Sequence, residues 1–437
     1  MSLFQHPANP QIQKSLRYSI IDGVFFTVML GSGERFFVPF ALMLGASYFE
    51  VGLVVALPLL FGSLSQLFSN HLIEKISSRK KVVVTGAFFQ ALMFAPMILL
   101  YFSPIHPVSL FIGLIICYWI CGHIIAPAWN SWMGDLVELQ SRGSYFGKRS
   151  RIMEFSTLIT FMIAGWYMHI MKGAHQEYIG FLTLFAVALV ARLVSFHFLN
   201  KKYEPYFEVK NESKFSFFQF LKKMKTTNFG HFVFFSVLMN FSFYVSAPYF
   251  TPYMLKELHF SYLQYMVLVA ASMTSRFIFM PAWGSYIDRY GTRKILTLSA
   301  SFLPLAVLLW MFSTNFYWII IVHIIAGFVW SGFELSSFNF ILDSTSSEKR
   351  ARCVAYYNAL NGIFILLGSL LGSQLIKINL FSATPVYTAF FGSFILRVLF
   401  TSAFLPQLKE VRPVETITYR KLFLQTLLQP VHILKQK

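Results

Sequence analysis

The chain has 437 residues, of which 56% are hydrophobic and only 12% are charged, and its mean hydropathy is +0.59. This composition excludes a water-soluble globular protein and places the chain in a membrane. The net charge of +18 does not indicate a nucleic-acid-binding protein, because the Lys and Arg residues follow the apolar segments and do not form one basic face.

Apolar segments of about 20 residues, long enough to cross a bilayer as a helix, recur along the whole chain. The outward loops would carry only Lys172, Lys256 and Lys377, whereas most other basic residues lie on the opposite side, so the positive-inside rule places both termini in the cytoplasm. The outward loops lack an N-x-[ST] sequon, which favours a bacterial inner membrane. We predict twelve transmembrane helices, near residues 18–44, 49–72, 82–102, 107–132, 153–171, 178–199, 229–254, 261–287, 295–312, 316–341, 354–376 and 383–405.

The first predicted helix carries two adjacent charges, Glu34 and Arg35, in the stretch GSGERFFVP. Glu34 would lie about 24 Å above the inner end of the helix, slightly beyond the bilayer midplane. A charge at that depth costs ~2.5 to 3.5 kcal/mol against lipid, so both side chains must face protein or water. Residues adjacent on a helix point about 100° apart, so the roles of Glu34 and Arg35 should differ.

Glu34 shares a helical face with Thr27 and Gly23, and we expect this stripe to line a water-filled path. Gly31 and Gly33 would let a neighbouring helix approach closely and shield Arg35. Glu34 then either carries a proton or belongs to a fixed ion pair that orients helices. Asp22, near the inner end of the same helix, is a further candidate for the pathway.

Two pairs of similar segments reveal an internal repeat. ASYFEVGLVVAL at residues 46–57 aligns with FSYLQYMVLVAA at 260–271, and an Asp stands seven residues before an Arg in each half, at Asp135 and Arg142 and again at Asp343 and Arg350. We predict two related six-helix bundles, 1–199 and 229–405. The linker 200–228 would contain an interfacial helix around Phe218, and the cytoplasmic tail 406–437 would contain a helix around residues 422–428.

Three other predicted helices each carry one polar stripe at helical spacing. Their histidines, His123 and His323, are expected to line a path and not to relay protons. Arg276, in the eighth helix, lies at a depth close to that of Glu334, and we predict that they pair. Arg192 and Arg397 are expected to snorkel to the inner interface. The stripes are Trp119, His123, Ala126 and Asn130 in the fourth helix, Ser236, Asn240 and Tyr244 in the seventh, and His323, Gly327, Trp330 and Glu334 in the tenth.

The loop after the eighth helix, GSYIDRYGTRK at residues 284–294, resembles the G-x-x-x-D-R-x-G-x-[RK]-[RK] signature of the major facilitator superfamily. The corresponding first-half loop, NHLIEKISSRKK, keeps the charges without the glycines, and residues 127–149 resemble bacterial members of unassigned substrate. The resemblance implies an all-α membrane protein whose twelve helices form two pseudo-symmetric six-helix bundles, with the first, fourth, seventh and tenth helices lining a cavity. It also implies a cytoplasmic gate formed by charged loop residues, namely Glu74, Asp135, Arg142, Asp288, Arg289, Arg293, Asp343 and Arg350.

These features predict a secondary active transporter that moves a small organic solute by alternating access, coupled to protons. Export is favoured over uptake because members of unassigned substrate are often exporters. An uptake permease or a transport-inactive receptor is the alternative. No nucleophile and base at catalytic spacing, no metal-ligand cluster and no phosphate-binding loop is found in the sequence, so we predict neither an enzyme nor a cofactor or metal. The expected partners are the solute, protons and lipids, with the chain acting as a monomer.

Overall fold

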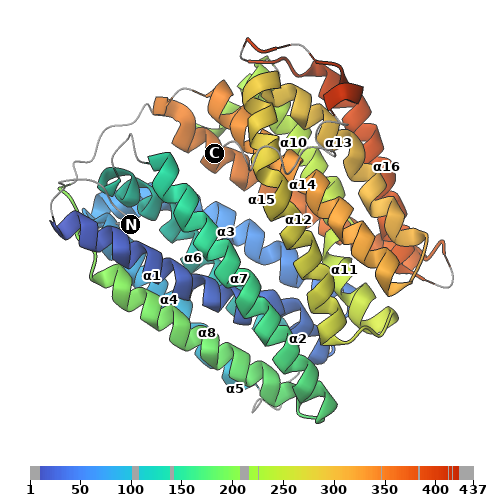
Figure 1. Ribbon diagram of the computed structural model, residues 1–437, viewed down its shortest axis with the longest axis horizontal. Helices are drawn as coiled ribbons and strands as arrows, with labels where there is room; N and C mark the ends of the chain where they lie inside the picture. Colours follow the sequence, from blue (N-terminus) through green and yellow to red (C-terminus); the bar gives the residue numbers. More distant parts are fainter. Residues whose placement is uncertain are drawn as a thin grey trace. The chain divides into compact units, whose positions relative to one another are not determined.

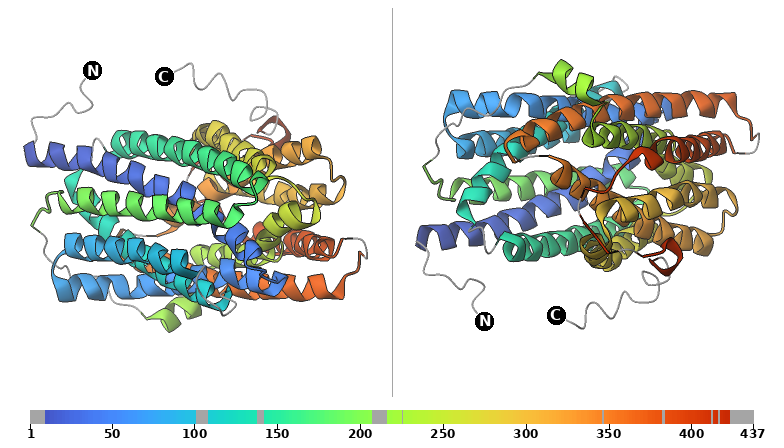
Figure 2. Two further views of the ribbon diagram at one scale, coloured as in Figure 1. Left: turned by 90° about the horizontal axis from the view of Figure 1, so that it is seen from below. Right: turned by 90° about the horizontal axis from the view of Figure 1, so that it is seen from above.

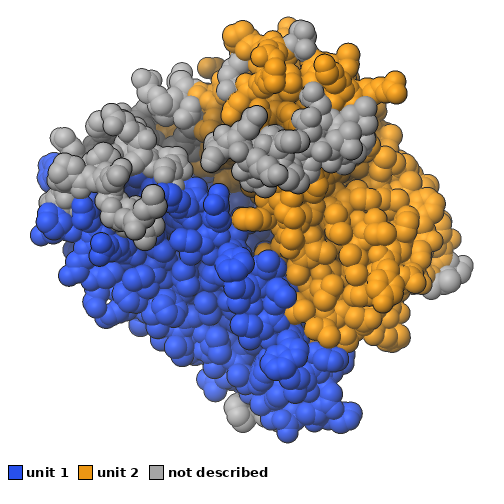
Figure 3. All heavy atoms as spheres, viewed as in Figure 1, with its two compact units in different colours: residues 1–210 blue, residues 211–437 orange. Residues whose placement is uncertain are grey.

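The computed structural model describes residues 10–100, 108–137, 142–206, 216–224, 226–345, 347–381, 384–411, 413–415 and 417–422, without the side chains of 70, 142–144 and 347–351. Within these residues the chain is helical and contains no strand (Figures 1 and 2). It divides into two compact units, residues 1–210 and 211–437, coloured separately in Figure 3.

In the first unit α1 packs against both α7 and α8, while α6 packs against α3 and α4. Phe40, Phe111 and Phe185 form part of an aromatic core, with ring centroids 4.9 Å apart for the first two and 5.0 Å for Phe40 and Phe185. The elements are α1 (Pro10–Ser32), η1 (Glu34–Phe36), α2 (Phe37–Met43), α3 (Tyr48–Ile76), α4 (Arg79–Leu92), α5 (Phe94–Leu99), α6 (Val108–Leu136), α7 (Arg142–Gly173) and α8 (Glu177–Asn200).

In the second unit α12 packs against α14, and α10 lies against α15 and α16. The elements are α9 (Phe217–Met224), α10 (Asn228–Tyr244), η4 (Ala247–Tyr249), α11 (Phe250–Pro252), η5 (Tyr253–Glu257), α12 (Tyr262–Tyr290), α13 (Thr292–Leu308), η6 (Leu309–Met311), α14 (Phe316–Ser344), α15 (Ser347–Ile378), α16 (Val386–Phe404) and η7 (Leu405–Gln407).

Eleven helical segments of the described chain are long and apolar enough to cross a membrane. The one remaining predicted helix, the fifth along the chain, is α7, which is equally long but more polar, with Lys148, Arg149, Arg151 and Glu154 near its N-terminal end. These segments account for all twelve helices predicted from the sequence.

The repeated Ser-Tyr segments start equivalent helices in the two units. Ser47 begins α3 with a capping box in which its side chain accepts from the Glu50 backbone and the Glu50 carboxylate accepts from the Ser47 backbone. Ser261 and Gln264 form the same reciprocal cap at the start of α12. Such a cap satisfies two backbone donors at a helix start, so the sequence similarity reflects a shared local structure.

The first long helix of each unit is interrupted. α1 stops at Ser32, a short 3₁₀ turn starts at Glu34, and α2 follows; in the second unit α10 is followed by the 3₁₀ turn η4, by α11 and by a π turn. Pro39 and Pro248 lack the backbone N–H that a continuous helix needs at these places. Interrupted helices at membrane depth occur where protein or a cavity surrounds them, so these breaks point to functional regions.

The linker and the tail are described only in part. The predicted interfacial helix corresponds to α9, in which Phe220 is buried against the second unit and Phe218 is exposed. Residues 423–437, where most of the predicted tail helix falls, lie outside the described chain, and so do residues 207–215 of the linker. The limits that we assign to the linker and the tail therefore stay predictions.

Candidate functional site

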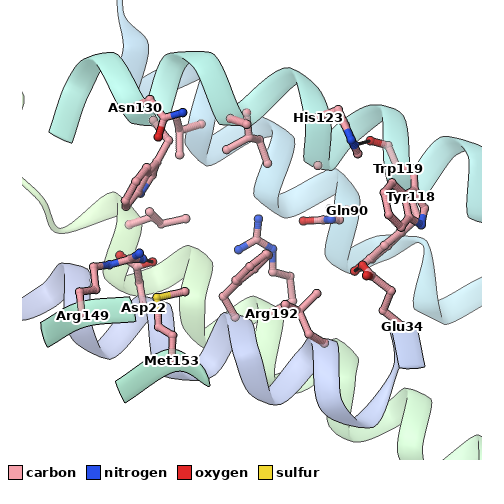
Figure 4. Close-up of a pocket in the computed structure, with 18 residues that line it drawn as sticks. Asp22, Glu34, Gln90, Tyr118, Trp119, His123, Asn130, Arg149, Met153 and Arg192 are labelled. Carbon is pink, nitrogen blue, oxygen red and sulfur yellow. Dashed lines mark hydrogen bonds and ion pairs between the residues drawn. The ribbon is translucent and has the colours of Figure 1, made fainter. Parts of the chain in front are cut away.

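A pocket of about 400 Å³ lies inside the first unit, between α1, α4, α6, α7 and α8 (Figure 4). Its walls are mostly aromatic and aliphatic, which is typical of sites for small organic molecules. A small number of polar groups interrupt these walls, and their placement determines what the pocket can bind. The charged and strongly polar ones are Asp22, Glu34, Gln90, His123, Arg149 and Arg192.

Glu34 is at the helix break, on the wall of this pocket. It is the first residue of η1, and its side chain is half-buried. The hydroxyl of Tyr118, on α6, donates a hydrogen bond to Glu34 Oε2 at 3.0 Å (Figure 4). Tyr118 itself is buried, with 1% of its surface exposed. The structure therefore gives this membrane-depth carboxylate one protein donor and places it against the pocket.

Arg35 does not share this environment, and the expectation that close helix packing shields it is wrong. Gly31 does allow close approach, since a Cβ there would meet Thr160 on α7, and Gly33 lies equally close to Phe94. Arg35, however, is exposed. The turn η1 begins between Gly33 and Arg35, so the side chain of Arg35 leaves the face on which the glycines pack.

The residues of α1 that line the pocket lie on a different face of the helix from the predicted stripe. Asp22, Phe26, Leu30 and Glu34 line the pocket, whereas Thr27 is buried and donates to the carbonyl of Val24 at 2.8 Å. Gly23 lies against the Arg149 guanidinium. The prediction assumed one continuous helix, and the break before Glu34 changes the angular phase between Glu34 and the residues that precede it.

Asp22 is part of a buried ion-pair cluster at the other end of the pocket. Lys202 Nζ lies 2.5 Å from Asp22 Oδ2, and Arg149 Nη2 lies 3.9 Å from Oδ1. Lys202, beyond the end of α8, is 1% exposed. Burial lowers the pKa of Lys202, and the Asp22 carboxylate opposes that change. The cluster resembles a structural ion pair more than an open pathway, because its charges already have partners.

Two of the three polar residues predicted on the fourth helix lie close to each other on the pocket wall. Trp119 and His123 stack with ring centroids 5.0 Å apart, and His123 Nδ1 donates to the Trp119 carbonyl oxygen at 3.1 Å. Asn130 also lines the pocket and is exposed. The hydrogen bond fixes the orientation of the His123 ring on the pocket wall.

Arg192 does not snorkel, contrary to the sequence-based expectation. It is 4% exposed, and its guanidinium points into the middle of the pocket (Figure 4). Arg192 Nη1 donates to Ser195 Oγ at 3.0 Å, and the guanidinium lies 4.8 Å from the ring centre of Phe26. Snorkelling requires a lipid-facing position, but this side of α8 packs against α1 and α4.

A second pocket, of about 250 Å³, lies within the second unit and contains His323, Trp330 and Arg276. Arg276 pairs with Glu334, as predicted from their similar depth. Trp330 stacks on Phe243 with ring centroids 4.3 Å apart. This pocket therefore gathers three of the residues predicted for the pathway.

Arg397 also lines the second pocket and is 3% exposed, so it does not snorkel either. Its Nη1 donates to the Leu303 carbonyl at 2.9 Å and its Nη2 donates to Ser246 Oγ at 3.1 Å. Both terminal nitrogens of this guanidinium thus have protein acceptors. Arg397 is buried because α16 packs its inner face on α10 and α13.

The polar residues predicted on the seventh helix lie away from that pocket. Asn240 Nδ2 donates to Asn361 Oδ1 at 3.1 Å, and the hydroxyls of Ser236 and Tyr357 are 2.7 Å apart, so both bonds join α10 to α15. Tyr244 is half-buried beside Phe243 and does not line the pocket.

Comparison with known proteins identifies the family. A model of the Major Facilitator Superfamily matches residues 23–252 and 232–427. The chain belongs to the major facilitator superfamily. It is therefore a multi-pass membrane transporter of the secondary kind and not an enzyme.

Solved structures of other transporters have the same fold as this chain. A mutant of the nucleoside transporter NupG is similar with a TM-score of 0.71 at 15% identity, over 91% of this chain and 100% of that one. A D-xylose-proton symporter is similar with a TM-score of 0.67 at 13% identity, over 91% and 98%. At these identities the likeness concerns the fold alone.

One curated relative is more similar in sequence but over a short stretch. The tetracycline resistance protein, class H, of Pasteurella multocida is 32% identical over 111 residues. The match covers 25% of this chain and 28% of that relative, so it spans little more than a quarter of the relative's length.

The loop charges that the superfamily resemblance assigned to a cytoplasmic gate are partly bonded within the first unit. Asp135 Oδ2 pairs with Arg79 Nη1 at 2.6 Å. Glu74 is exposed, and its carboxylate forms no ion pair with a described residue, so its gate role stays a prediction. Glu204 instead bonds at this loop and accepts from the Lys80 backbone at 3.0 Å. The side chain of Arg142 lies outside the described chain.

The second unit repeats this arrangement. Asp343 accepts from the Thr292 hydroxyl at 2.9 Å, and Glu410 accepts from the Arg293 backbone N–H at 2.8 Å. Arg289 pairs with Glu415 at 2.8 Å on the surface. Asp288 is exposed and has no ion pair within the described chain, and the side chain of Arg350 is not described.

Sequence reasoning missed Glu204 and Glu410 because neither belongs to the family signature. Both follow the last helix of their unit, and each accepts a hydrogen bond from the second residue of the third helix, α4 or α13. A carboxylate is favourable at a helix N-terminus, where backbone N–H groups lack partners. The one available signal was positional: each is an acidic residue that stands a few residues beyond the end of the last helix of its half.

Proposed function

We propose that this transporter moves a small organic solute across the bacterial inner membrane and couples that movement to protons through Glu34. Alternating access by the two units would expose the solute to each side in turn. The observation that carries the proposal is the position of Glu34, a carboxylate at membrane depth, at a helix break and on the wall of the pocket in the first unit.

A carboxylate in this position is suited to proton transfer. Ionisable residues inside a membrane are costly, and those that persist commonly belong to ion or substrate pathways. The Tyr118 hydroxyl stabilises the ionised form of Glu34, while the aromatic surroundings favour its protonated form. A protonated and an ionised Glu34 can then favour different states of the transporter, which is what coupling requires.

The size of the pocket supports an organic solute. Its volume of about 400 Å³ lies within the range of roughly 300–1,000 Å³ typical of small-molecule sites. The named relatives are a drug-resistance protein, a nucleoside transporter and a sugar-proton symporter. Their names refer to small organic molecules and state no direction of transport, so flux has to be measured with solute loaded on either side.

The test uses purified protein in proteoliposomes and a solute found by thermal-shift screening. Glu34→Gln should abolish solute flux driven by a pH gradient, because Gln cannot release a proton. Solute exchange without a gradient should survive, because Gln resembles the protonated acid. Glu154→Gln, a matched change at an exposed position outside the pocket, should keep both activities. Gradient-driven flux that is unchanged in Glu34→Gln would remove the coupling proposal.

A further inference from the structure

We infer that the pocket of the first unit binds the carboxylate of an organic anion through Arg192, with the apolar walls holding the rest of the solute. This inference rests on the proposed transport function and names the class of its solute. It is carried by a buried guanidinium that points into a cavity and has no acidic partner among the residues that the structure describes.

Arg192 differs from the other buried cations of its unit. Arg149 and Lys202 pair with Asp22, and Arg79 pairs with Asp135. Arg192 forms no ion pair with any carboxylate in the described part of the chain, and its Nε has no hydrogen-bond acceptor there. A buried charge without a counterion is strongly unfavourable. An anion bound in the pocket would stabilise the charge of Arg192.

Gln90 provides a second unpartnered polar group beside the guanidinium. It is 3% exposed, and its Oε1 has no hydrogen-bond partner among the described residues. Figure 4 shows the Gln90 amide extending into the same space as Arg192. The two ends of an amide are interchangeable by rotation, so Gln90 can present its N–H groups to an incoming oxygen. Two buried groups, each with one polar atom that lacks a partner among the described residues, therefore converge on one space.

The donor set fits a carboxylate better than a phosphate. A guanidinium matches the two oxygens of a carboxylate with two parallel hydrogen bonds. A doubly charged phosphate would need further cations, but the other cations near the pocket, Arg149 and Lys202, already share Asp22. One unpaired positive charge in this wall thus favours a singly charged anion.

The remaining walls indicate the body of the solute. Phe26, Leu30, Trp119, Ile125 and Trp129 line the pocket. Flat indole and phenyl faces favour an aromatic or alicyclic group by stacking and by burying apolar area. The solute class is therefore a monocarboxylate with a compact apolar body.

Arg397 of the second unit offers a matched control. It is equally buried on the corresponding last helix, and its Nε also lacks an acceptor among the described residues. Both of its terminal nitrogens donate to protein acceptors, Leu303 and Ser246, whereas Arg192 has one such bond, from Nη1 to Ser195. Arg397 therefore has less need of an external anion. Replacing it tests whether any buried guanidinium affects the result or only the one in the pocket of the first unit.

The experiment is a thermal-shift titration of the purified full-length chain. The probes are benzoate, 1-naphthoate and indole-3-acetate, each beside its neutral amide, together with inorganic phosphate. We expect the carboxylates to raise Tm in a concentration-dependent way and the amides to leave it unchanged. Arg192→Met should abolish the shift, and Arg192→Lys should weaken apparent affinity about tenfold, because one point charge replaces a two-pronged donor. Arg397→Met should retain the shift.

The unliganded variants give a second readout. If Arg192 is an anion-binding residue, then in the absence of any probe Arg192→Met should have a higher Tm than the parent protein. The reason is that an apolar side chain of similar length replaces a buried charge without a counterion. A lower Tm would assign Arg192 to structure and overturn the inference. The inference also fails if the amides stabilise as well as the acids, if phosphate alone shifts Tm, if Arg192→Met keeps the shift, or if no probe binds.

Failure here is distinguishable from failure of the proposed transport function. A neutral solute that shows pH-gradient-driven flux lost in Glu34→Gln would leave proton-coupled transport standing while removing the carboxylate. Loss of the coupling with carboxylate binding intact would give the opposite result.

Discussion

Tyr118 is the one described residue whose hydrogen bond reaches the Glu34 carboxylate, at 3.0 Å. Tyr118→Phe removes only that hydroxyl and leaves a carboxylate at the pocket wall without its donor. We predict a loss of about 1–3 kcal/mol in the free energy of unfolding. Thermal unfolding in detergent measures it, with Tyr317→Phe, at a residue that is 74% exposed, as the control. Equal stability of the two variants would show that the bond contributes nothing.

The ion-pair cluster around Asp22 allows a second prediction about stability at the scale of single residues. Lys202→Met removes the cation 2.5 Å from a buried carboxylate and should cost about 3–5 kcal/mol of stability, because the carboxylate keeps its burial but loses its nearest counterion. Adding Asp22→Asn to that variant should recover part of the loss. A double variant less stable than Lys202→Met alone would contradict the pairing as the source of the cost.

At the scale of elements, the interruption of the first helix depends on close packing at Gly33. A Cβ at this position would lie 2.8 Å from the Phe94 ring and 2.9 Å from Ala188, so α5 and α8 leave no room for a side chain. The close approach holds the break, and Glu34 with it, against the pocket.

We therefore predict that Gly33→Ala lowers stability by about 1–3 kcal/mol through overpacking. Gly113→Ala is the matched control: its Cβ would meet nothing within 4 Å, so the better helix propensity of Ala should leave stability unchanged or raise it by up to about 1 kcal/mol. Melting curves of the two variants decide the matter. If both behave alike, packing at Gly33 does not maintain the break.

The elements themselves were largely predictable from the sequence. Apolar length identified the membrane helices, the repeated Ser-Tyr segments marked two equivalent helix starts, and depth along the helix paired Arg276 with Glu334. These features depend on chain-local quantities such as length, capping residues and rise per residue. Each of these features can be predicted without knowing how the helices pack.

The face that a side chain occupies was not predictable in the same way. In a water-soluble helix polarity separates the exposed face from the packed one, but in a membrane both the lipid-facing and the packed face are apolar. The sequence therefore could not show that Arg192 and Arg397 point inward or that Arg35 points outward. The break at Gly33 added a phase change that no periodicity on α1 contains.

At the scale of the whole molecule, each unit holds its own buried core. One core cluster in the first unit joins residues of α3, α4, α6, α7 and α8, and another in the second unit extends from Phe220 to Leu422. The two cores share no residue, so the covalent link between residues 210 and 211 is not needed to complete either one.

A chain split at that point should therefore still fold. We predict that residues 1–210 and 211–437, produced as separate chains, are each recovered folded, and that 1–210, which contains the larger pocket, keeps ligand-induced stabilisation in a thermal-shift assay. Units that are recovered only as aggregates, although the intact chain is stable, would show that the cores are not independent.

The sign of coupling also belongs to this scale. If the solute is a carboxylate, its charge shares one pocket with Glu34. Two negative charges in one site disfavour each other, so solute binding should favour protonated Glu34. By reciprocity, protonation then favours solute binding, and the two move in the same direction. If the solute is a carboxylate, we therefore predict uptake along an inward proton gradient, as the alternative to the export that the family resemblance favours.

The most direct test of the central claim, that Glu34 couples the solute to protons, is the lumenal pH of proteoliposomes. A carboxylate identified by thermal shift is added outside vesicles that contain a pH indicator and have no initial pH gradient. We predict acidification of the lumen beyond that of protein-free vesicles, and no such excess in Glu34→Gln. Entry of the solute through the parent protein without excess acidification would contradict the account.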